Sequence, residues 1–267
     1  MNYKKTFICL NIFLGFLISN AQNSENSLFE KKEFIRNNDT LKYRILYPIN
    51  FSKEKQYPVV LFLHGSGERG SDNYSQLTHG SSLFLANDNR KQFPAIVVFP
   101  QCPENDYWAN TEVDRTTQPI SLKFANGGES TKSLGLTMSL MDNLLNDSYV
   151  IKEQVYVMGL SMGGMGTFEI LSRKPLMFAA AVPICGGGNP ETAVNYAKNT
   201  ALWVFHGAKD DVVNPLLSLE MVAAILNAGG KPSFTLYDID NHNSWDSAFS
   251  EPQLLPWLFS KIKNKNE

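Results

Sequence analysis

Short apolar runs alternate with longer amphipathic stretches along most of this chain. The runs are typical of strands buried in a parallel sheet, and they lie at 58–63, 95–99, 155–158, 178–185, 201–205 and 233–237. Apolar residues at helical spacing occupy the intervals near 132–146, 162–173, 215–228 and 252–263. Strands separated by helices predict βαβ units, and therefore an α/β fold with a mostly parallel sheet flanked by helices.

The segment before these runs predicts a hairpin over 34–47 that turns at Asn37-Asn38-Asp39. With 267 residues, of which 43% are hydrophobic and 19% charged, the chain can bury one large core. We therefore expect a single domain over residues 22–267. The net charge of −2 indicates no basic surface that could bind nucleic acid, so we expect no nucleic-acid partner.

The first residues have the pattern of a secretory signal. Lys4 and Lys5 precede an apolar stretch at 7–18, and Ser19-Asn20-Ala21 is a small-residue cleavage site. The stretch is short for a membrane span, although a retained anchor is the alternative. We expect residues 1–21 to be a signal peptide, the mature protein to be secreted or periplasmic, and no membrane association after cleavage.

Cleavage would leave two cysteines, Cys102 and Cys185. If they follow the fourth and sixth strands, three strand spacings of about 4.8 Å separate them. A disulfide needs Cα atoms within about 7 Å. We expect free thiols, unless loop excursions bring the two residues together.

A candidate nucleophile follows the run at 155–158, in the sequence Gly159-Leu160-Ser161-Met162-Gly163. A serine exposed at a sharp strand-to-helix turn has this pattern, because the turn leaves room only for glycine two residues on either side. The motif alone is weak evidence, and catalysis also requires a base and an orienting acid.

The base and acid are sought after Ser161, since in the α/β-hydrolase arrangement the chain order is serine, acid, histidine. His206 precedes the nearby acids, and we expect it, like His64, to hold a loop by hydrogen bonding. His242 lies in a polar loop after the strand at 233–237 and is the expected base. We interpret His79 as a surface residue. Four acids precede His242, of which the first is favoured: Asp210, Asp211, Asp238 and Asp240.

An acyl-transfer site also needs donors for an oxyanion. The backbone N–H of Met162, at the start of a helix, is one candidate. Ser66, in the glycine-rich loop at 64–70, is the other. No large cap domain fits between Ser161 and Asp210, so we expect an open cleft rimmed by Trp108 and Trp245 as substrate-binding residues.

Five segments in order carry a family resemblance. The chain resembles exported α/β-hydrolases known as predicted peptidases or phospholipase/carboxylesterase-like esterases, relatives of dienelactone hydrolase and feruloyl esterases. The resemblance covers about residues 40–262, implies a sheet of the eight-stranded type without a large cap, and places the acid on Asp210 and an oxyanion donor on Ser66. The segments are Leu63-His64-Gly65-Ser66-Gly67-Glu68-Arg69-Gly70, Pro100-Gln101-Cys102-Pro103, Gly159-Leu160-Ser161-Met162-Gly163-Gly164, His206-Gly207-Ala208-Lys209-Asp210-Asp211-Val212-Val213 and His242-Asn243-Ser244-Trp245-Asp246.

These residues predict a serine esterase in which Ser161, His242 and Asp210 form the triad. We expect a short-acyl, aromatic or carbohydrate-linked ester as substrate, with no cofactor and no metal, because the sequence has no cysteine and histidine cluster with ligand spacing. A prolyl-oligopeptidase-like serine peptidase would use the same triad and remains an alternative. A non-catalytic carbohydrate-binding protein is another, supported by Tyr107, Trp108 and Trp245.

Overall fold

The computed structural model describes residues 26–263, and the predicted signal peptide at 1–21 lies outside them. An eight-stranded sheet runs through the molecule in the order β1-β2-β4-β3-β7-β8-β9-β10. β1 pairs with β2 and β2 with β4 in antiparallel fashion, and the remaining pairs are parallel. The strands are β1 (Glu30–Arg36), β2 (Asp39–Leu46), β3 (Tyr57–Leu63), β4 (Ile96–Pro100), β7 (Val150–Leu160), β8 (Ala180–Ile184), β9 (Ala201–Gly207) and β10 (Ser233–Tyr237).

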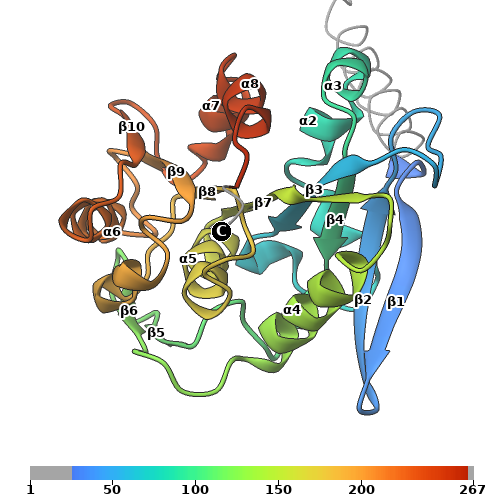
Figure 1. Ribbon diagram of the computed structural model, residues 1–267. Helices are drawn as coiled ribbons and strands as arrows, with labels where there is room; N and C mark the ends of the chain where they lie inside the picture. The colour runs from blue at the N-terminus through green and yellow to red at the C-terminus, as the bar shows by residue number, and fades with distance from the viewer. Residues whose placement is uncertain (1–25, 264–267) are drawn as a thin grey trace, which may run out of the picture.

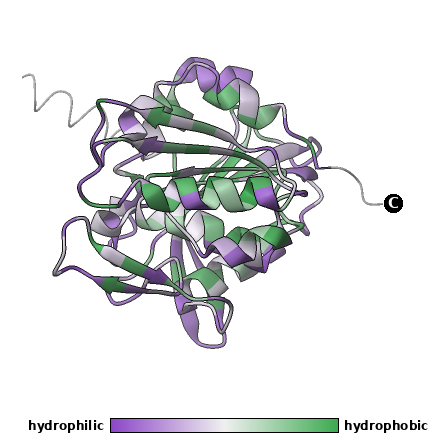
Figure 2. Cartoon of the chain, turned by 90° about the vertical axis from the view of Figure 1, so that its left-hand side faces the viewer, coloured by the Kyte–Doolittle hydropathy of each residue, from purple (hydrophilic) through white to green (hydrophobic). Residues whose placement is uncertain are grey.

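Helices cover both faces of this sheet (Figure 1). Successive residues of a strand point to opposite faces, so that Leu61 packs in a core cluster with α4, α5 and α6 and Phe62 in a second cluster with α2, α7 and α8. Interior strands are mostly apolar and the loops mostly polar (Figure 2). The helices are α2 (Ser81–Leu85), α3 (Asn87–Gln92), α4 (Lys132–Leu144), α5 (Met162–Arg173), α6 (Leu216–Asn227), α7 (Trp245–Phe249) and α8 (Leu254–Phe259).

The predicted hairpin and the helices near 132–146, 162–173 and 215–228 are confirmed. Asn37 and Asn38 have φ values of 52° and 66°, as a two-residue turn between twisted strands requires. The helix expected over 252–263 is wrong in extent, since α8 covers only Leu254–Phe259 and a separate short helix, α7, precedes it. After α8 the chain runs back toward the sheet, where the N–H of Lys263 donates to the carbonyl of Glu153.

A second, two-stranded sheet was not predicted. Its strands, β5 (Thr111–Asp114) and β6 (Ser121–Phe124), pair antiparallel. Both strands are four residues long and half exposed, so they lack the continuous apolar run that marks the buried strands.

Cys102 and Cys185 are buried free thiols, as expected. They follow β4 and β8, which are separated in the sheet by β3 and β7. None of the helices within residues 26–263 has the length and apolar character needed to cross a bilayer.

Candidate active site

Ser161 occupies the sharp turn between β7 and α5. Its φ of 53° and ψ of −117° lie outside the regions that residues with a side chain prefer, and such strain is common at functional turns. A Cβ added at Gly159 would lie 2.2 Å from the carbonyl oxygen of Gly163, and one at Gly163 would lie 1.9 Å from that of Leu63. The turn therefore tolerates only glycine at these two positions.

An unbroken chain of hydrogen bonds connects Ser161, His242 and Asp210. His242 Nε2 is 3.0 Å from Ser161 Oγ, and His242 Nδ1 is 2.7 Å from Asp210 Oδ2. His242 lies in the loop between β10 and α7, and Asp210 follows β9. The structure thus brings together the three residues that the sequence places at the carboxyl ends of parallel strands, where sites of such sheets form.

Asp210 has a completely buried side chain. Its Oδ1 accepts from the N–H groups of Val212 and Val213, both at 2.9 Å, and its Oδ2 faces both His242 and His206. Burial alone would raise the pKa of Asp210, but the hydrogen bonds from His206 and His242 outweigh it and hold that pKa well below its usual range. The carboxylate is therefore ionised at neutral pH.

The neighbouring acids do not take this place. Asp211 is exposed, and its main-chain N–H donates to Asn241 Oδ1 at 3.1 Å. The first turn of α6 is capped by Asn214, whose Oδ1 accepts from the N–H of Leu216. Among the described residues, Asp210 is the one carboxylate that makes a hydrogen bond to His242.

His64 holds a loop, as expected. Its Nε2 accepts from the N–H of Cys102 at 3.0 Å, and its Nδ1 is 2.7 Å from the carbonyl oxygen of Gly65. These partners fix the tautomer with the proton on Nδ1. Burial lowers the pKa of His64 from 6.5 to about 4, so the imidazole is neutral in the folded protein near neutral pH.

We expect His64 to make the protein less stable in mild acid. Between pH 6.5 and about 4 the unfolded chain binds a proton that folded His64 does not. The free energy of unfolding should therefore fall as the pH is lowered through this window, by up to about 3 kcal/mol from this group. His64→Gln can still accept from Cys102 but cannot titrate. Urea unfolding at several pH values should give a shallower pH dependence for this variant, and equal slopes for the two proteins would contradict the assignment.

The two expected oxyanion donors are each the first residue of a helical segment. Met162 is the first residue of α5, and Ser66 is the first residue of the 3₁₀ helix η1 (Ser66–Glu68). A first helical residue has no acceptor for its N–H within its own helix. The main chain at Leu63 and His64 packs directly against Gly163, so the Ser66 loop is held beside the start of α5.

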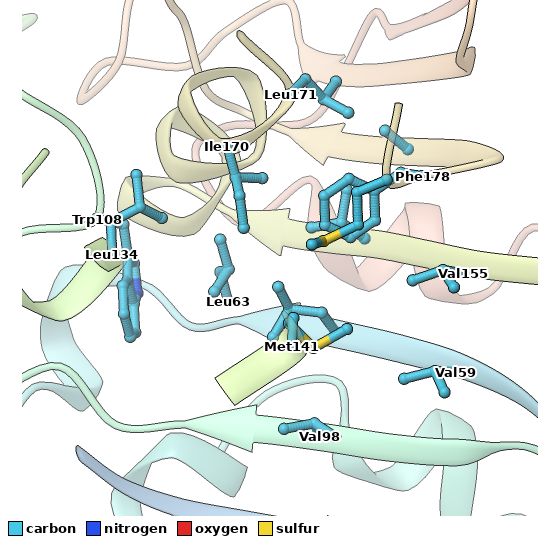
Figure 3. Packing of buried hydrophobic residues seen from close by; sticks show 14 of the residues in the cluster. Val59, Leu63, Val98, Trp108, Leu134, Met141, Val155, Ile170, Leu171 and Phe178 are labelled. Atoms are coloured by element: carbon cyan, nitrogen blue, oxygen red, sulfur yellow. The ribbon is translucent and has the colours of Figure 1, made fainter. Parts of the chain in front are cut away.

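The two tryptophans have different positions, and the prediction for Trp108 is wrong. Its side chain is fully buried, packs in the core with Leu63 and Leu134 (Figure 3), and donates from Nε1 to the carbonyl of His64 at 3.1 Å. A Cβ at Gly166 would lie 2.4 Å from the Trp108 Cβ, so the absence of a side chain on α5 makes room for the indole. Trp108 therefore cannot form the rim of a cleft.

Trp245, by contrast, is half-buried and lies beside the triad. Its ring stands edge-to-face with that of His242 at 5.4 Å and lies 5.2 Å from that of His79. His79 Nε2 is 3.7 Å from Glu68 Oε1. The interpretation of His79 as a plain surface residue therefore misses its place near the site. Glu68 lies in the first of the five family segments, whereas none of these segments includes His79.

The β5–β6 hairpin reaches the acid loop from the other side. The N–H of Ile120 donates to the carbonyl of Val212 at 2.9 Å. Ile120, Leu122 and Phe124 pack against a small buried cluster that includes Met165 on α5 and Val213. This hairpin therefore contributes to the surroundings of both the nucleophile helix and the acid.

One group of three possible metal ligands occurs within residues 26–263. Ligand atoms of Cys185, Asp210 and His242 lie within 4.8 Å of one another. Asp210 and His242 are already hydrogen-bonded to each other, and burial raises the pKa of the Cys185 thiol, which keeps it protonated. The group is better explained as the interior of the hydrogen-bonded site than as a metal centre.

Sequence comparisons connect the chain with esterases. The model of the family described as Putative esterase matches residues 36–254. Feruloyl esterase B of Thermothelomyces thermophilus is 24% identical over 254 residues, which cover 82% of this chain and 80% of that protein. A bifunctional acetylxylan esterase/xylanase of Neocallimastix patriciarum is 30% identical over 86 residues, which are 32% of this chain and 13% of the relative.

Solved structures show the same fold. A thermostable esterase superimposes with a TM-score of 0.80 at 30% identity, covering 89% of this chain and 64% of the other. A ferulic acid esterase does so with a TM-score of 0.63 at 20% identity, covering 86% and 97%. Dipeptidyl peptidase 4 of Porphyromonas gingivalis gives 0.62 at 14% identity, covering 88% and 36%. The last two likenesses show the fold alone.

Proposed function

This chain belongs to the Putative esterase family and is a hydrolase of the α/β-hydrolase fold, and on this premise we propose that it cleaves carboxylic esters through an acyl-enzyme on Ser161. One observation carries the proposal. The hydrogen bonds from Ser161 through His242 to Asp210, at 3.0 and 2.7 Å, start from a serine held on a strained turn. This is the geometry in which a hydroxyl becomes a nucleophile.

The reaction follows from these contacts. Ser161 Oγ attacks the ester carbonyl carbon as His242 Nε2 takes its proton, and the carbonyl oxygen becomes an oxyanion that accepts from the N–H groups of Ser66 and Met162. The intermediate collapses when His242 returns the proton to the departing alcohol. A water molecule, deprotonated by His242, then attacks the acyl carbon. The bond from that carbon to Ser161 Oγ breaks, Ser161 regains the proton from His242, and the carboxylic acid leaves. Asp210 orients the imidazole and stabilises its charged form.

For the substrate we propose an aromatic or carbohydrate-linked ester. Relatives named as a feruloyl esterase and an acetylxylan esterase support this class. Trp245 supports it as well, because its indole lies against the ring of His242 and beside the Glu68–His79 pair. An aromatic face next to polar side chains suits a phenyl or sugar ring.

For the location we propose export. The positive start, short apolar stretch and small-residue site within residues 1–21 support a cleaved signal peptide. The mature enzyme would then be secreted or periplasmic and would meet a small-molecule or polysaccharide-linked ester without membrane association.

A hydrolysis panel tests the activity and its range. We expect the protein to hydrolyse p-nitrophenyl acetate, a feruloyl ester and an acetylated sugar, each with a higher kcat/KM than a twelve-carbon acyl ester, by about tenfold or more. Proline-containing peptides should be cleaved far more slowly. Faster turnover of the twelve-carbon ester would refute the substrate class, and efficient peptide cleavage would favour a peptidase.

The contribution of Trp245 can be separated within the same panel. Trp245→Ala should lower kcat/KM for the feruloyl ester more than for the acetate, because only the larger group reaches the indole. Trp257→Ala is the matched control, since Trp257 lies on α8 and packs against Trp203. The same change in preference from both variants would indicate a general effect of losing an indole.

A further inference from the structure

His206 is a buried imidazole that the mechanism above does not use. It lies at the end of β9, four residues before Asp210, and its side chain is completely inaccessible. Nε2 is 3.1 Å from Asp210 Oδ2 and 3.1 Å from the carbonyl oxygen of Val213. Nδ1 is 2.8 Å from Ser218 Oγ on α6.

The partners of His206 Nε2 determine its protonation. A carboxylate oxygen and a carbonyl oxygen can only accept hydrogen bonds. If Nε2 had no proton, three acceptors would face one another among completely buried side chains, which is unfavourable. Nε2 therefore carries a proton, and this N–H donates a hydrogen bond toward Asp210 Oδ2 and the carbonyl oxygen of Val213.

The other ring nitrogen allows two arrangements, and both keep this donor. Ser218 Oγ also lies 3.0 Å from the carbonyl oxygen of Gly186. A hydroxyl donates only once, so Ser218 donates either to Gly186 and accepts from a protonated Nδ1, or directly to an unprotonated Nδ1. In each arrangement His206 presents Nε2–H to Asp210.

Asp210 Oδ2 is consequently shared between two imidazoles, one on each side. The contact with His242 Nδ1 measures 2.7 Å and the contact with His206 Nε2 measures 3.1 Å. In the described part of the chain, Asp210 forms no ion pair with a lysine or arginine. The titratable groups that face it are His206 from β9, His242 from the loop after β10, and the neutral thiol of Cys185 from the end of β8.

We propose that His206 is a positioning residue for the catalytic acid. Its Nε2–H donates to Asp210 Oδ2 and so holds the carboxylate in position for His242. Because this oxygen also accepts from His242 Nδ1, the second hydrogen bond limits how strongly Asp210 stabilises protonated His242. The inference rests on the proposed serine esterase function, and it assigns to His206 a role that His64 does not have.

Two variants separate this role from simple packing. His206→Leu fills a similar volume without a donor, whereas His206→Gln retains an amide N–H. For hydrolysis of p-nitrophenyl acetate we expect the leucine variant to lose about 10- to 100-fold in kcat/KM through misplacement of the acid and base. The acid limb of its pH profile should move to higher pH by about one unit or less, because the remaining imidazole then has the carboxylate oxygen to itself. The glutamine variant should keep the wild-type limb.

If the leucine variant does not fold, NMR spectroscopy tests the proposed hydrogen bond without any measurement of catalysis. Long-range ¹H–¹⁵N correlation spectra of the histidine side chains, recorded on the Ser161→Ala protein at neutral pH, should show a protonated Nε2 for His206. An unprotonated Nε2, or a folded leucine variant with an unshifted acid limb and unchanged kcat/KM, would overturn the proposal. If wild-type protein hydrolysed none of the esters, the proposed function would fail, while the spectrum would still report on His206.

Discussion

Ser161→Ala should reduce kcat for ester hydrolysis by about 10⁴- to 10⁶-fold. The variant removes the oxygen that lies 3.0 Å from His242 Nε2, and no acyl-enzyme can then form on this turn. Ser172→Ala is a matched control, because Ser172 lies on the same helix and its hydroxyl donates to the carbonyl of Glu169. We expect near-normal turnover from the control and equal thermal unfolding temperatures for the two variants.

The loss from Ser161→Ala should not add to the loss from His242→Ala. Residues that act in one proton transfer behave as a unit, so the double variant should be about as slow as either single variant. Steady-state kinetics on p-nitrophenyl acetate with all three proteins measures this. A Ser161→Ala protein that kept near-normal turnover, or strictly additive losses, would require a different nucleophile.

The second large effect concerns the two adjacent acids. Asp210→Asn should lower kcat by about 10⁴-fold, because the amide can donate to His242 Nδ1 and stabilise the wrong tautomer. Asp211→Asn should leave kcat close to normal, since Asp211 faces solvent. It should also leave stability unchanged within about 0.5 kcal/mol, because Asn214, rather than Asp211, caps α6.

Both effects are measured by kcat at saturating substrate and by urea unfolding. Reversed phenotypes would mean that the orienting acid is one residue further along the chain. Two active variants would direct attention to Asp238 or Asp240 as the orienting acid.

The sequence predicts this fold well where a segment carries its own signal. Continuous apolar runs mark the buried strands, and the glycines at 159 and 163 mark the turn around Ser161, where added side chains would meet the main chain of Gly163 and of Leu63. The order of serine, acid and histidine then brings the three residues to one edge of the sheet. The short strands of the β5–β6 hairpin carry no such signal, since they are half exposed and gain their place by packing on Met165.

Side-chain contacts that form only in the folded chain explain what the sequence could not predict. His64 and His206 both lie at the end of an apolar strand and precede a glycine, so their sequence contexts are alike. In the structure, His64 Nε2 accepts a hydrogen bond from the N–H of Cys102, whereas His206 Nε2 is hydrogen-bonded to the carboxylate of Asp210. Trp108 follows a polar stretch that suggests exposure, but the missing side chain of Gly166 admits its ring to the core. Such outcomes depend on which surfaces meet after folding.

The β5–β6 hairpin has a consequence for how this enzyme class can diversify. The hairpin pairs with no strand of the main sheet, and its main-chain link to the acid loop is the bond from Ile120 to Val212. Insertions in its turn at 115–119, before Ile120, can therefore change the surroundings of the acid loop without shifting the register of any strand that carries a triad residue. Replacing this hairpin with one of different length should therefore change ester selectivity while the positions of Ser161, His242 and Asp210 stay the same.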